Sequence, residues 1–283
     1  MVERLLGMFA FAIWDTRRQE LFLARDRFGK KPLYYSLDVP GFRIAFASEL
    51  KALALLPGFP ADVNPSAVSR FLSFGYIPDP ATIYRCASKL APAHTLTLSR
   101  DGVKLRRYWE PDFHTEDSRG FGDTVEEIRS LATDAVTRRM IADVPLGAFL
   151  SGGVDSSAAV GIMAGHSSVP VKTFSIGFTN PDFDELKYAR MAAALHRTDH
   201  REQVVTPQVE EIFDTLPSAF DEPFGDASAI PTLYLAKMTR QHVTVALSGD
   251  GADEVFGGYR RYYFGVLEER LRACFPQWFR RSV

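Results

Sequence analysis

The chain has 283 residues, of which 46% are hydrophobic and 24% are charged, as is ordinary for a globular protein. Its 33 Lys and Arg residues nearly balance 35 Asp and Glu residues, and this net charge of −2 gives no support to a nucleic-acid partner. No apolar run reaches the roughly 18 residues that a membrane helix needs. Cys86 and Cys274 fit neither a metal spacing nor a disulfide framework, which favours a reducing, cytoplasmic compartment.

Residues 1 to about 110 are typical of an antiparallel β-rich region. Short aromatic or β-branched runs alternate there with Gly, Pro and Asp turn signals. The runs are GMFAFAIWD, ELFLARD, PLYYSL, RIAFAS, HTLTL and KLRRYW. The letters SRDG between the last two predict a hairpin turn. A helix is predicted over 65–74, with Asn64 as its N-cap and Pro65 at its first position.

Residues 111–122 are polar and contain glycine, which predicts a linker. Asp123, with Glu126 three residues later, predicts the capped start of a helix. Beyond it, helix patterns alternate with strands that are almost unbroken apolar runs, and this alternation predicts a doubly wound α/β domain with a parallel sheet. We expect strands at 146–150, 171–178, 201–205 and 243–248, and helices near 154–165, 184–196, 207–215 and 231–241.

The segment LSGGVDSS, residues 150–157, directly follows the first of these strands and opens a helix. Its glycines permit a tight turn, and the unpaired amides and dipole of a helix start attract an anion. Ser156 and Ser157 add hydroxyl donors. A carboxylate at Asp155 would repel phosphate unless a divalent cation such as Mg²⁺ lay between them. The segment therefore predicts a phosphate cradle with magnesium, whereas the plainer alternative is a simple strand-to-helix turn.

A second segment, SGDGADEVFGGY at residues 248–259, also follows an apolar strand and opens a helix. It crowds the carboxylates of Asp250, Asp253 and Glu254 together. Their repulsion must be relieved by a metal, by a substrate ammonium group or by raised pKa values. A capped helix start with solvated acids is the alternative interpretation.

Another charged stretch, Arg25-Asp26 followed by Lys30-Lys31, has two interpretations. It could be a patch between domains or a solvated turn.

The segment at 150–157 resembles the pyrophosphate loop of the ATP-pyrophosphatase superfamily. Together with the second segment, DVPLGAFLSGGVDSS resembles asparagine synthetase of the glutamine-hydrolysing type. GMFAFAIWD, LFLARDRFGKKPLYY and FASELKAL are similar to the later part of that family's glutaminase domain, so the likeness covers nearly the whole chain. Two departures are LAPAHTLTL, where relatives usually carry a Pro-Gly turn, and Asp250, where many relatives have Glu.

The resemblance implies a fold of two parts. Residues 1–110 would be the antiparallel, β-rich C-terminal part of an N-terminal-nucleophile glutaminase domain (amidotransferase type 2), and residues 111–122 the linker. Residues 123–283 would be part of a doubly wound, parallel-sheet ATP-pyrophosphatase domain.

The resemblance also implies a reaction in which aspartate and ATP give β-aspartyl-AMP and pyrophosphate, and ammonia from glutamine then displaces AMP. Asp155 and Asp253 would hold Mg²⁺, and Asp250 and Glu254 would act near the amino-acid substrate. ATP and its pyrophosphate would be contacted by Leu150, Ser151, Gly152, Gly153, Asp155, Ser156, Ser157, Ile176, Ser248 and Gly249.

In that family an N-terminal cysteine hydrolyses glutamine. Cys86 and Cys274 have no free α-amino group to serve as base, so we expect both to be structural. The abrupt ends of the sequence suggest a fragment that does not hydrolyse glutamine. Two alternatives stay open: a related ligase that closes a ring or amidates another carboxylate, and a truncated remnant without activity. The sequence does not give the oligomeric state, and a homodimer stays open.

Overall fold

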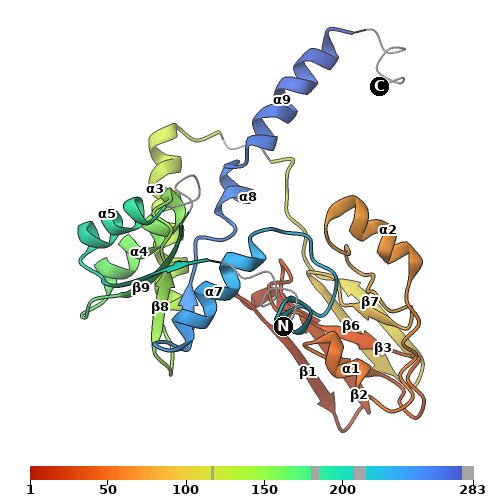
Figure 1. Ribbon diagram of the computed structural model, residues 1–283. Helices are drawn as coiled ribbons and strands as arrows, with labels where there is room; N and C mark the ends of the chain where they lie inside the picture. Colours follow the sequence, from red (N-terminus) through yellow and green to blue (C-terminus); the bar gives the residue numbers. More distant parts are fainter. Residues whose placement is uncertain (116–117, 180–184, 207–214, 276–283) are drawn as a thin grey trace. The chain divides into compact units, whose positions relative to one another are not determined.

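A computed structural model describes residues 1–115, 118–179, 185–206 and 215–275 of the chain (Figure 1). The backbone forms two compact units. The first unit combines Met1–Ser118 with Gln208–Ala229, and the second combines Arg119–Pro207 with Ile230–Val283. The first unit is therefore assembled from two stretches that lie far apart in the sequence, which the sequence pattern did not predict.

The larger layer of the first unit is an antiparallel sheet in the order β1-β2-β6-β7. Its strands are β1 (Ala10–Asp15), β2 (Glu20–Arg25), β6 (His94–Ser99) and β7 (Gly102–Arg107). Leu23 of β2 lies opposite Leu96 of β6, and both are fully buried. Because alternate side chains of a strand share a face, Leu21 and Leu23 of β2 enter the same core as Leu96 and Leu98 of β6. The core consists of Leu21, Leu23, Leu33, Leu90, Leu96 and Leu98.

A second, smaller sheet has the antiparallel order β4-β3-β5. Its strands are β3 (Tyr34–Ser36), β4 (Ala45–Ala47) and β5 (Ala87–Lys89), and the helical elements of this unit are η1 (Val2–Arg4), α1 (Leu50–Ala54) and α2 (Pro65–Phe74). Leu50 and Leu53 of α1 are buried against this sheet. Helix α1 was not predicted, because five residues are too few to carry a recognisable period.

Helix α2 begins and ends as its sequence predicts. The side chain of Asn64 accepts a hydrogen bond from the Ser66 amide at 3.1 Å, and Pro65 occupies the first turn, where it has no amide to leave unpaired. Gly75 ends the helix with a left-handed φ of 78°, a conformation that is costly for a residue with a Cβ.

The second unit is built on a parallel sheet in the order β10-β9-β8-β11. Its strands are β8 (Leu146–Phe149), β9 (Lys172–Phe178), β10 (Asp199–Val205) and β11 (Val245–Leu247). All three pairings are parallel, which confirms the predicted α/β class. The chain starts at β8, steps through β9 to β10 on one side, and then returns to place β11 on the other side of β8. The order in which the chain adds strands to the sheet therefore reverses between β8 and β11.

Helices cover both faces of this sheet (Figure 1). Ala148 lies in a core shared with α4 and α5, whereas its neighbour Phe149 packs on the opposite face with Met238 of α7. Successive side chains of β8 therefore enter two separate cores, one on each face, as expected of a doubly wound sheet. The helices of this unit are α3 (Phe121–Arg139), α4 (Val154–His166), α5 (Leu186–His196), α7 (Ala229–Arg240), α8 (Ala252–Phe256) and α9 (Arg260–Ala273).

Two expectations about helices need comment. Helix α3 begins at Phe121 with Gly120 as its N-cap, so the prediction that Asp123 caps it was wrong, and the last two residues of the predicted 111–122 linker are helical. Asp123 lies instead in the first turn, where its charge favours the positive end of the helix dipole. The helix predicted near 207–215 falls almost entirely outside the described residues.

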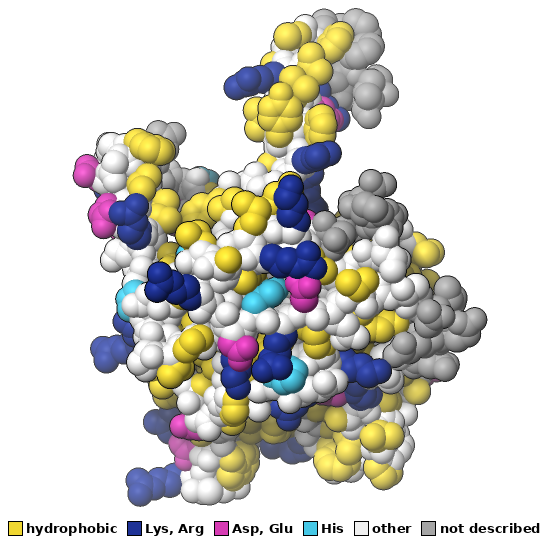
Figure 2. Space-filling model, turned by 60° about the vertical axis from the view of Figure 1, so that its left-hand side comes forward, with side chains coloured by type: hydrophobic (Ala, Val, Ile, Leu, Met, Phe, Trp, Pro, Cys, Tyr) yellow, Lys and Arg dark blue, Asp and Glu magenta, His cyan; other side chains and the backbone are white. Residues whose placement is uncertain are grey.

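Helix α9 carries an apolar surface. Tyr263, Phe264 and Leu271 are more than half exposed, and hydrophobic side chains cover much of this helix in Figure 2. None of the helices in the described part of the chain combines the length and the apolar character needed to cross a membrane.

The capping geometry of α2 predicts the effect of changing Asn64. Asn64→Ala should destabilise α2 by about 1 kcal/mol, because the Ser66 amide loses its acceptor, whereas Asn64→Asp should keep the stability within about 0.5 kcal/mol. Hydrogen exchange of the α2 amides measures both. Equal losses in the two variants would show that the side-chain oxygen is not what stabilises this helix start.

Candidate functional site

The loop after β8 has the geometry expected of an anion cradle. Gly152 has a left-handed φ of 82°, and a Cβ there would lie 2.4 Å from the amide nitrogen of Ala189, so only glycine fits. Helix α4 starts at Val154, and its first internal hydrogen bond runs from the Ser157 amide to the Gly153 carbonyl at 3.1 Å. The amides of residues 154–156 precede that bond and have no partner within the helix.

Two serines of the loop organise it from within. The hydroxyl of Ser156 lies 2.9 Å from that of Ser151 and accepts from the Ser151 amide at 3.2 Å. The Ser151 hydroxyl in turn accepts from the Gly153 amide at 3.2 Å. Ser156 is buried, so in this conformation its hydroxyl holds the turn rather than facing outward, whereas no hydrogen bond among the described residues involves the Ser157 hydroxyl.

Leu150 and Ile176 occupy less accessible positions than the glycines. The Leu150 side chain is 1% exposed and belongs to the core under α4, so only its backbone can reach a ligand. Its amide donates to the Phe174 carbonyl at 2.9 Å, and its carbonyl accepts from the Ser175 hydroxyl. Ile176 lies within β9 rather than at its end, half-buried on the α7 face of the sheet.

The second segment meets the first at Gly249. Ser248 and Gly249 directly follow β11, the neighbour of β8. A Cβ on Gly249 would lie 2.8 Å from the Ser156 amide nitrogen and 3.0 Å from the Asp155 Cβ. The two loops that the sequence singled out, about a hundred residues apart, therefore touch at the carboxyl end of adjacent parallel strands. The strand order reverses between these two strands, and open α/β sheets bind their ligands at such topological switch points.

The four acidic side chains of the site divide into two kinds. Asp250 accepts a hydrogen bond from the Ser248 hydroxyl at 2.9 Å, and Glu254 accepts from the Tyr259 hydroxyl at 2.9 Å. The hydrogen bond to Glu254 raises the pKa of Tyr259 above its ordinary value. Within the described residues no side-chain hydrogen bond or ion pair involves Asp155. The same holds for the Asp253 carboxylate, which lies against the backbone of Gly258.

The carboxylates of this site suit a magnesium ion that is also coordinated by phosphate oxygens. Such an ion takes one or two carboxylates and completes its coordination with water and phosphate oxygens. Asp155 and Asp253 supply two carboxylates for which the described part of the chain offers no hydrogen-bond or ion-pair partner. Across the described ranges no group of three His, Cys, Asp or Glu side chains could hold a metal without such help.

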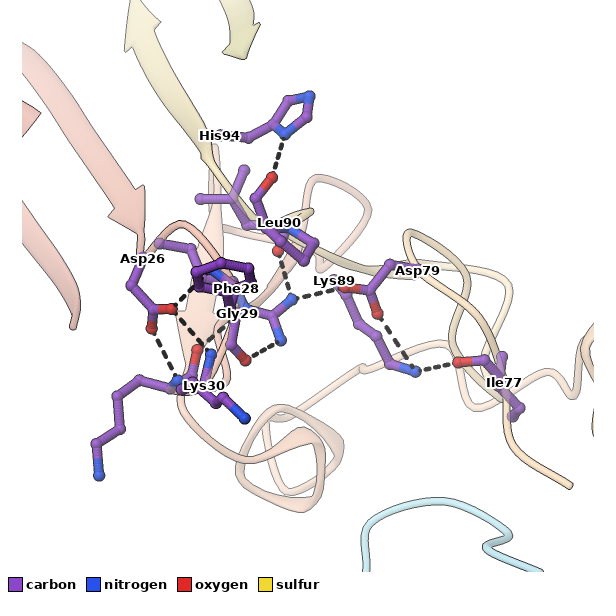
Figure 3. Close-up of polar contacts among 12 residues, drawn as sticks. Asp26, Phe28, Gly29, Lys30, Ile77, Asp79, Lys89, Leu90 and His94 are labelled. Atoms are coloured by element: carbon purple, nitrogen blue, oxygen red, sulfur yellow. Dashed lines mark hydrogen bonds and ion pairs between the residues drawn. The ribbon is translucent and has the colours of Figure 1, made fainter. Parts of the chain in front are cut away.

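The stretch after Arg25-Asp26 forms the predicted turn with Lys30 and Lys31 exposed, but Arg25 and Asp26 themselves are buried in a charged network of the first unit. Asp26 is 1% exposed and accepts from the amides of Phe28, Lys30 and Lys31, so it shapes a turn rather than meeting solvent (Figure 3). It also accepts from the Phe9 amide at 3.2 Å. The Arg25 guanidinium donates to Asp79 at 2.8 Å and to the Leu90 carbonyl at 2.6 Å. Both residues are thus internal to the first unit, and only the spacing of Asp26 before Gly29 hinted at such a turn.

Cys86 has the surroundings of a structural residue. The thiol of Cys86 donates to the Pro60 carbonyl at 3.1 Å, and burial raises its pKa, which disfavours a reactive thiolate. Cys274 is exposed on the turn that ends α9, and both cysteines are free.

Comparison with known proteins adds independent findings. A family model described as asparagine synthase matches residues 127–282, and one described as glutamine amidotransferase domain matches residues 1–109. Asparagine synthetase (glutamine-hydrolyzing) 1 of Bacillus subtilis is 39% identical over 266 residues, which cover 92% of this chain and 40% of that protein. Asparagine synthetase (glutamine-hydrolyzing) 3 of the same organism is 36% identical over 305 residues, 98% of this chain and 49% of its own length.

The chain therefore spans less than half the length of each of these two relatives. Among solved structures, the NH3-dependent NAD synthetase from Campylobacter jejuni aligns with a TM-score of 0.33 at 12% identity. The alignment covers 47% of this chain and 60% of that one.

The contact at Gly249 predicts what a methyl group would do there. Gly249→Ala should destabilise the second unit by about 1–3 kcal/mol, because the added Cβ forces the backbone at Asp155 and Ser156 to move. Gly165→Ala is the matched control in α4, where a Cβ meets nothing within 4 Å, and it should leave stability unchanged or raise it by up to about 1 kcal/mol. Urea denaturation followed by circular dichroism compares them, and equal behaviour would contradict the close approach.

Proposed function

We propose, because this chain belongs to the asparagine synthase family, that its second unit binds ATP and uses it to activate the side-chain carboxylate of aspartate for amidation to asparagine. The observation that carries the proposal is the contact of Gly249 with Asp155 and Ser156, at the turning point of the parallel sheet. A glycine cradle and a helix start lie there, and three acids, Asp250, Asp253 and Glu254, follow Gly249 within five residues of the chain. Few other chemistries need phosphate affinity and clustered acids at once.

The proposed reaction has two balanced steps. An oxygen of the aspartate side chain attacks the α-phosphorus of ATP, forming a carboxyl-phosphate bond and releasing pyrophosphate as the α–β phosphoanhydride bond breaks. The product is β-aspartyl-AMP. The nitrogen of ammonia then attacks the acyl carbon, AMP leaves with the bonding electrons, and the ammonium loses a proton to give asparagine.

The loop residues would act by holding charge rather than by forming bonds. The amides of residues 154–156 and the backbone of Ser151, Gly152 and Gly153 would cradle the departing pyrophosphate, with the Ser157 hydroxyl as a further donor. The backbone at Leu150, Ile176, Ser248 and Gly249 would contact the nucleotide. Held in one place, the two reactants avoid much of the entropic cost of meeting.

Magnesium, when bound, would supply positive charge between the carboxylates and the pyrophosphate oxygens. We assign its protein ligands to Asp155 and Asp253, the two site acids without a hydrogen-bond or ion-pair partner among the described residues. Asp250 and Glu254 keep hydroxyl partners of their own and would face the ammonium group of the amino acid. Their negative charge suits a cationic neighbour.

We assign the source of ammonia to glutamine, in keeping with the names of the relatives and with the glutamine amidotransferase match over residues 1–109. Cys86 is not proposed as the nucleophile, since burial raises the pKa of its thiol and its sulfur donates to a backbone carbonyl. Two free thiols support a reducing, cytoplasmic setting.

An assay of pyrophosphate release tests the function directly. The chain, supplied with Mg-ATP, should release pyrophosphate in the presence of aspartate and ammonia but not with ATP alone. Release with a different carboxylic acid and not with aspartate would indicate a related ligase. Failure to bind Mg-ATP at millimolar concentration in calorimetry would indicate a remnant without activity.

Asp155 is the sharpest single test of the cradle. Asp155→Asn should lower the affinity for Mg-ATP by at least about tenfold, because a neutral amide is a poor magnesium ligand. Asp143→Asn makes the same chemical change at an exposed position before β8 and should leave the affinity unchanged. Calorimetry with and without Mg²⁺ separates the two, and an undiminished affinity in Asp155→Asn would remove the carboxylate from the metal site.

The division of roles among the other acids predicts different kinetic signatures. Asp250→Asn and Glu254→Gln should raise the KM for aspartate by at least about tenfold with little change in ATP affinity, because they remove charge opposite the substrate ammonium. Asp253→Asn should weaken Mg-ATP binding instead. Steady-state kinetics of pyrophosphate release measure both, and the reverse pattern would exchange the two assignments.

A further inference from the structure

Residues 215–229 fold as part of the first unit although they lie inside the stretch that matches the asparagine synthase model. We call this segment the strap. It leaves the second unit after β10 and returns to it within the first turn of α7. Its contacts with the rest of the first unit include the Lys89–Glu222 ion pair and hydrogen bonds that join residues 139 to 171 positions apart in sequence.

Asp221 anchors one end of the strap. Its side chain, 9% exposed, accepts a hydrogen bond from the Leu50 amide at the start of α1, and its other oxygen lies 3.4 Å from the Lys51 ammonium. Lys51 also donates to the Ser218 carbonyl at 2.9 Å. The side chain of Glu49, the N-cap residue of α1, makes no capping hydrogen bond. Asp221 of the strap accepts the Leu50 amide instead and so caps the helix.

Glu222 makes a second anchor, and its lysine partner is far less exposed than Lys51. Its carboxylate is 11% exposed and lies 2.6 Å from the ammonium of Lys89, which is 12% exposed, and it accepts from the Ile83 amide at 2.7 Å. Lys89 also donates to the Ile77 carbonyl at 2.7 Å and lies 3.9 Å from Asp79, the partner of Arg25 (Figure 3). A buried ion pair whose other hydrogen-bonding groups also have partners is costly to break.

The strap is held again at Gly225, whose amide donates to the Gly75 carbonyl at 2.7 Å. A Cβ on Gly225 would lie 3.2 Å from that carbonyl oxygen, so the two backbones are in close contact. Asp226 then accepts from the Ser228 amide at 2.8 Å, and α7 begins at Ala229. Only three residues separate the Gly225 anchor from the start of α7.

Helix α7 leads on to the sheet of the second unit. Its Met238 is buried with Phe174 and Val243, and the half-buried Ile176, a proposed nucleotide contact, packs against the same cluster. The path from the Lys89–Glu222 pair to the nucleotide end of the sheet is therefore continuous along one short stretch of chain.

We infer that the strap is a tie between the two units, in which Asp221 and Glu222 are positioning residues that couple Mg-ATP binding in the second unit to the order of α1 and β5 in the first. The coupling to Mg-ATP rests on the proposed function, whereas the tie itself does not. Neither residue touches substrate. Coupling of this kind is reciprocal, so loosening the strap in the first unit must alter α7, and ligand binding near α7 must alter the strap's anchors.

Hydrogen exchange measured by mass spectrometry on the whole chain tests the tie without ligand. Glu222→Gln should raise the exchange of residues 83–89 and of the first turn of α7 by at least about tenfold, because a buried lysine loses its charged partner. Glu110→Gln removes an exposed acid paired with Arg107 in the same unit and should change both regions by less than about threefold. Gly225→Ala, a milder change at the other anchor, should raise exchange in α7 in the same direction as Glu222→Gln.

The ligand arm adds Mg-ATP. In the unaltered chain Mg-ATP should slow exchange in α1 and residues 83–89, and this protection should vanish in Glu222→Gln while its Mg-ATP affinity changes by less than that of Asp155→Asn. Faster exchange confined to residues 83–89, with α7 unchanged in both strap variants, would overturn the inference and leave the proposed function intact. A chain that fails to bind Mg-ATP in calorimetry would overturn the proposed function and the ATP coupling, and the ligand-free arm would still decide the tie.

Discussion

The second unit depends on a close approach of two backbones beside Gly249. Its α-carbon faces Asp155 and Ser156 at a separation that admits no Cβ, so the loops after β8 and β11 meet through main chain rather than through side chains. Backbone contact fixes the spacing of the helix-start amides relative to the acids of the second loop. Side chains could shift to fill a gap, but main chain has no such freedom, and this rigidity is what a phosphate cradle needs.

That approach is a consequence of sheet topology. Where the strand order reverses, the loops after two neighbouring parallel strands lead to opposite faces of the sheet and start side by side. After β8 and β11, glycine allows the backbones of these two loops to come into contact. The loop at Gly152 shows the same restriction on its other side, where the backbone of Tyr188 and Ala189 in α5 leaves no room for a side chain. The cradle is thus enclosed by main chain from two directions.

The sequence was most informative where a signal was local. The strands at 146–150 and 171–178 were predicted because apolar runs identify buried parallel strands, and Asn64 with Pro65 marked a helix start by short-range chemistry. The start of α3 was misplaced because Gly120, which has no capping side chain, precedes a first turn that holds an acid at Asp123. Both glycine motifs were found in advance, but their contact depends on strand order, which no local pattern reports.

The remaining features could not be read from the sequence because they are long-range. Asp221 and Glu222 are two adjacent acids in the stretch AFDEPFG, and nothing nearby in the sequence indicates that Asp221 accepts the first amide of a helix about 170 residues earlier or that Glu222 pairs with Lys89. Arg25 and Asp26 were equally ambiguous, since their burial depends on a turn and a carbonyl, Leu90, that come from separate strands and loops.

The discontinuous make-up of the first unit has a consequence for how such a chain can be divided. One cut between Ser118 and Arg119 would leave Lys89 on one piece and its closest acid, Glu222, on the other. Separately expressed halves would therefore lose this buried ion pair until they recombined, and Lys89 would keep only Asp79 at 3.9 Å. Exchange of the first unit between relatives by gene fusion would succeed only where the incoming lysines meet a strap that bears matching carboxylates.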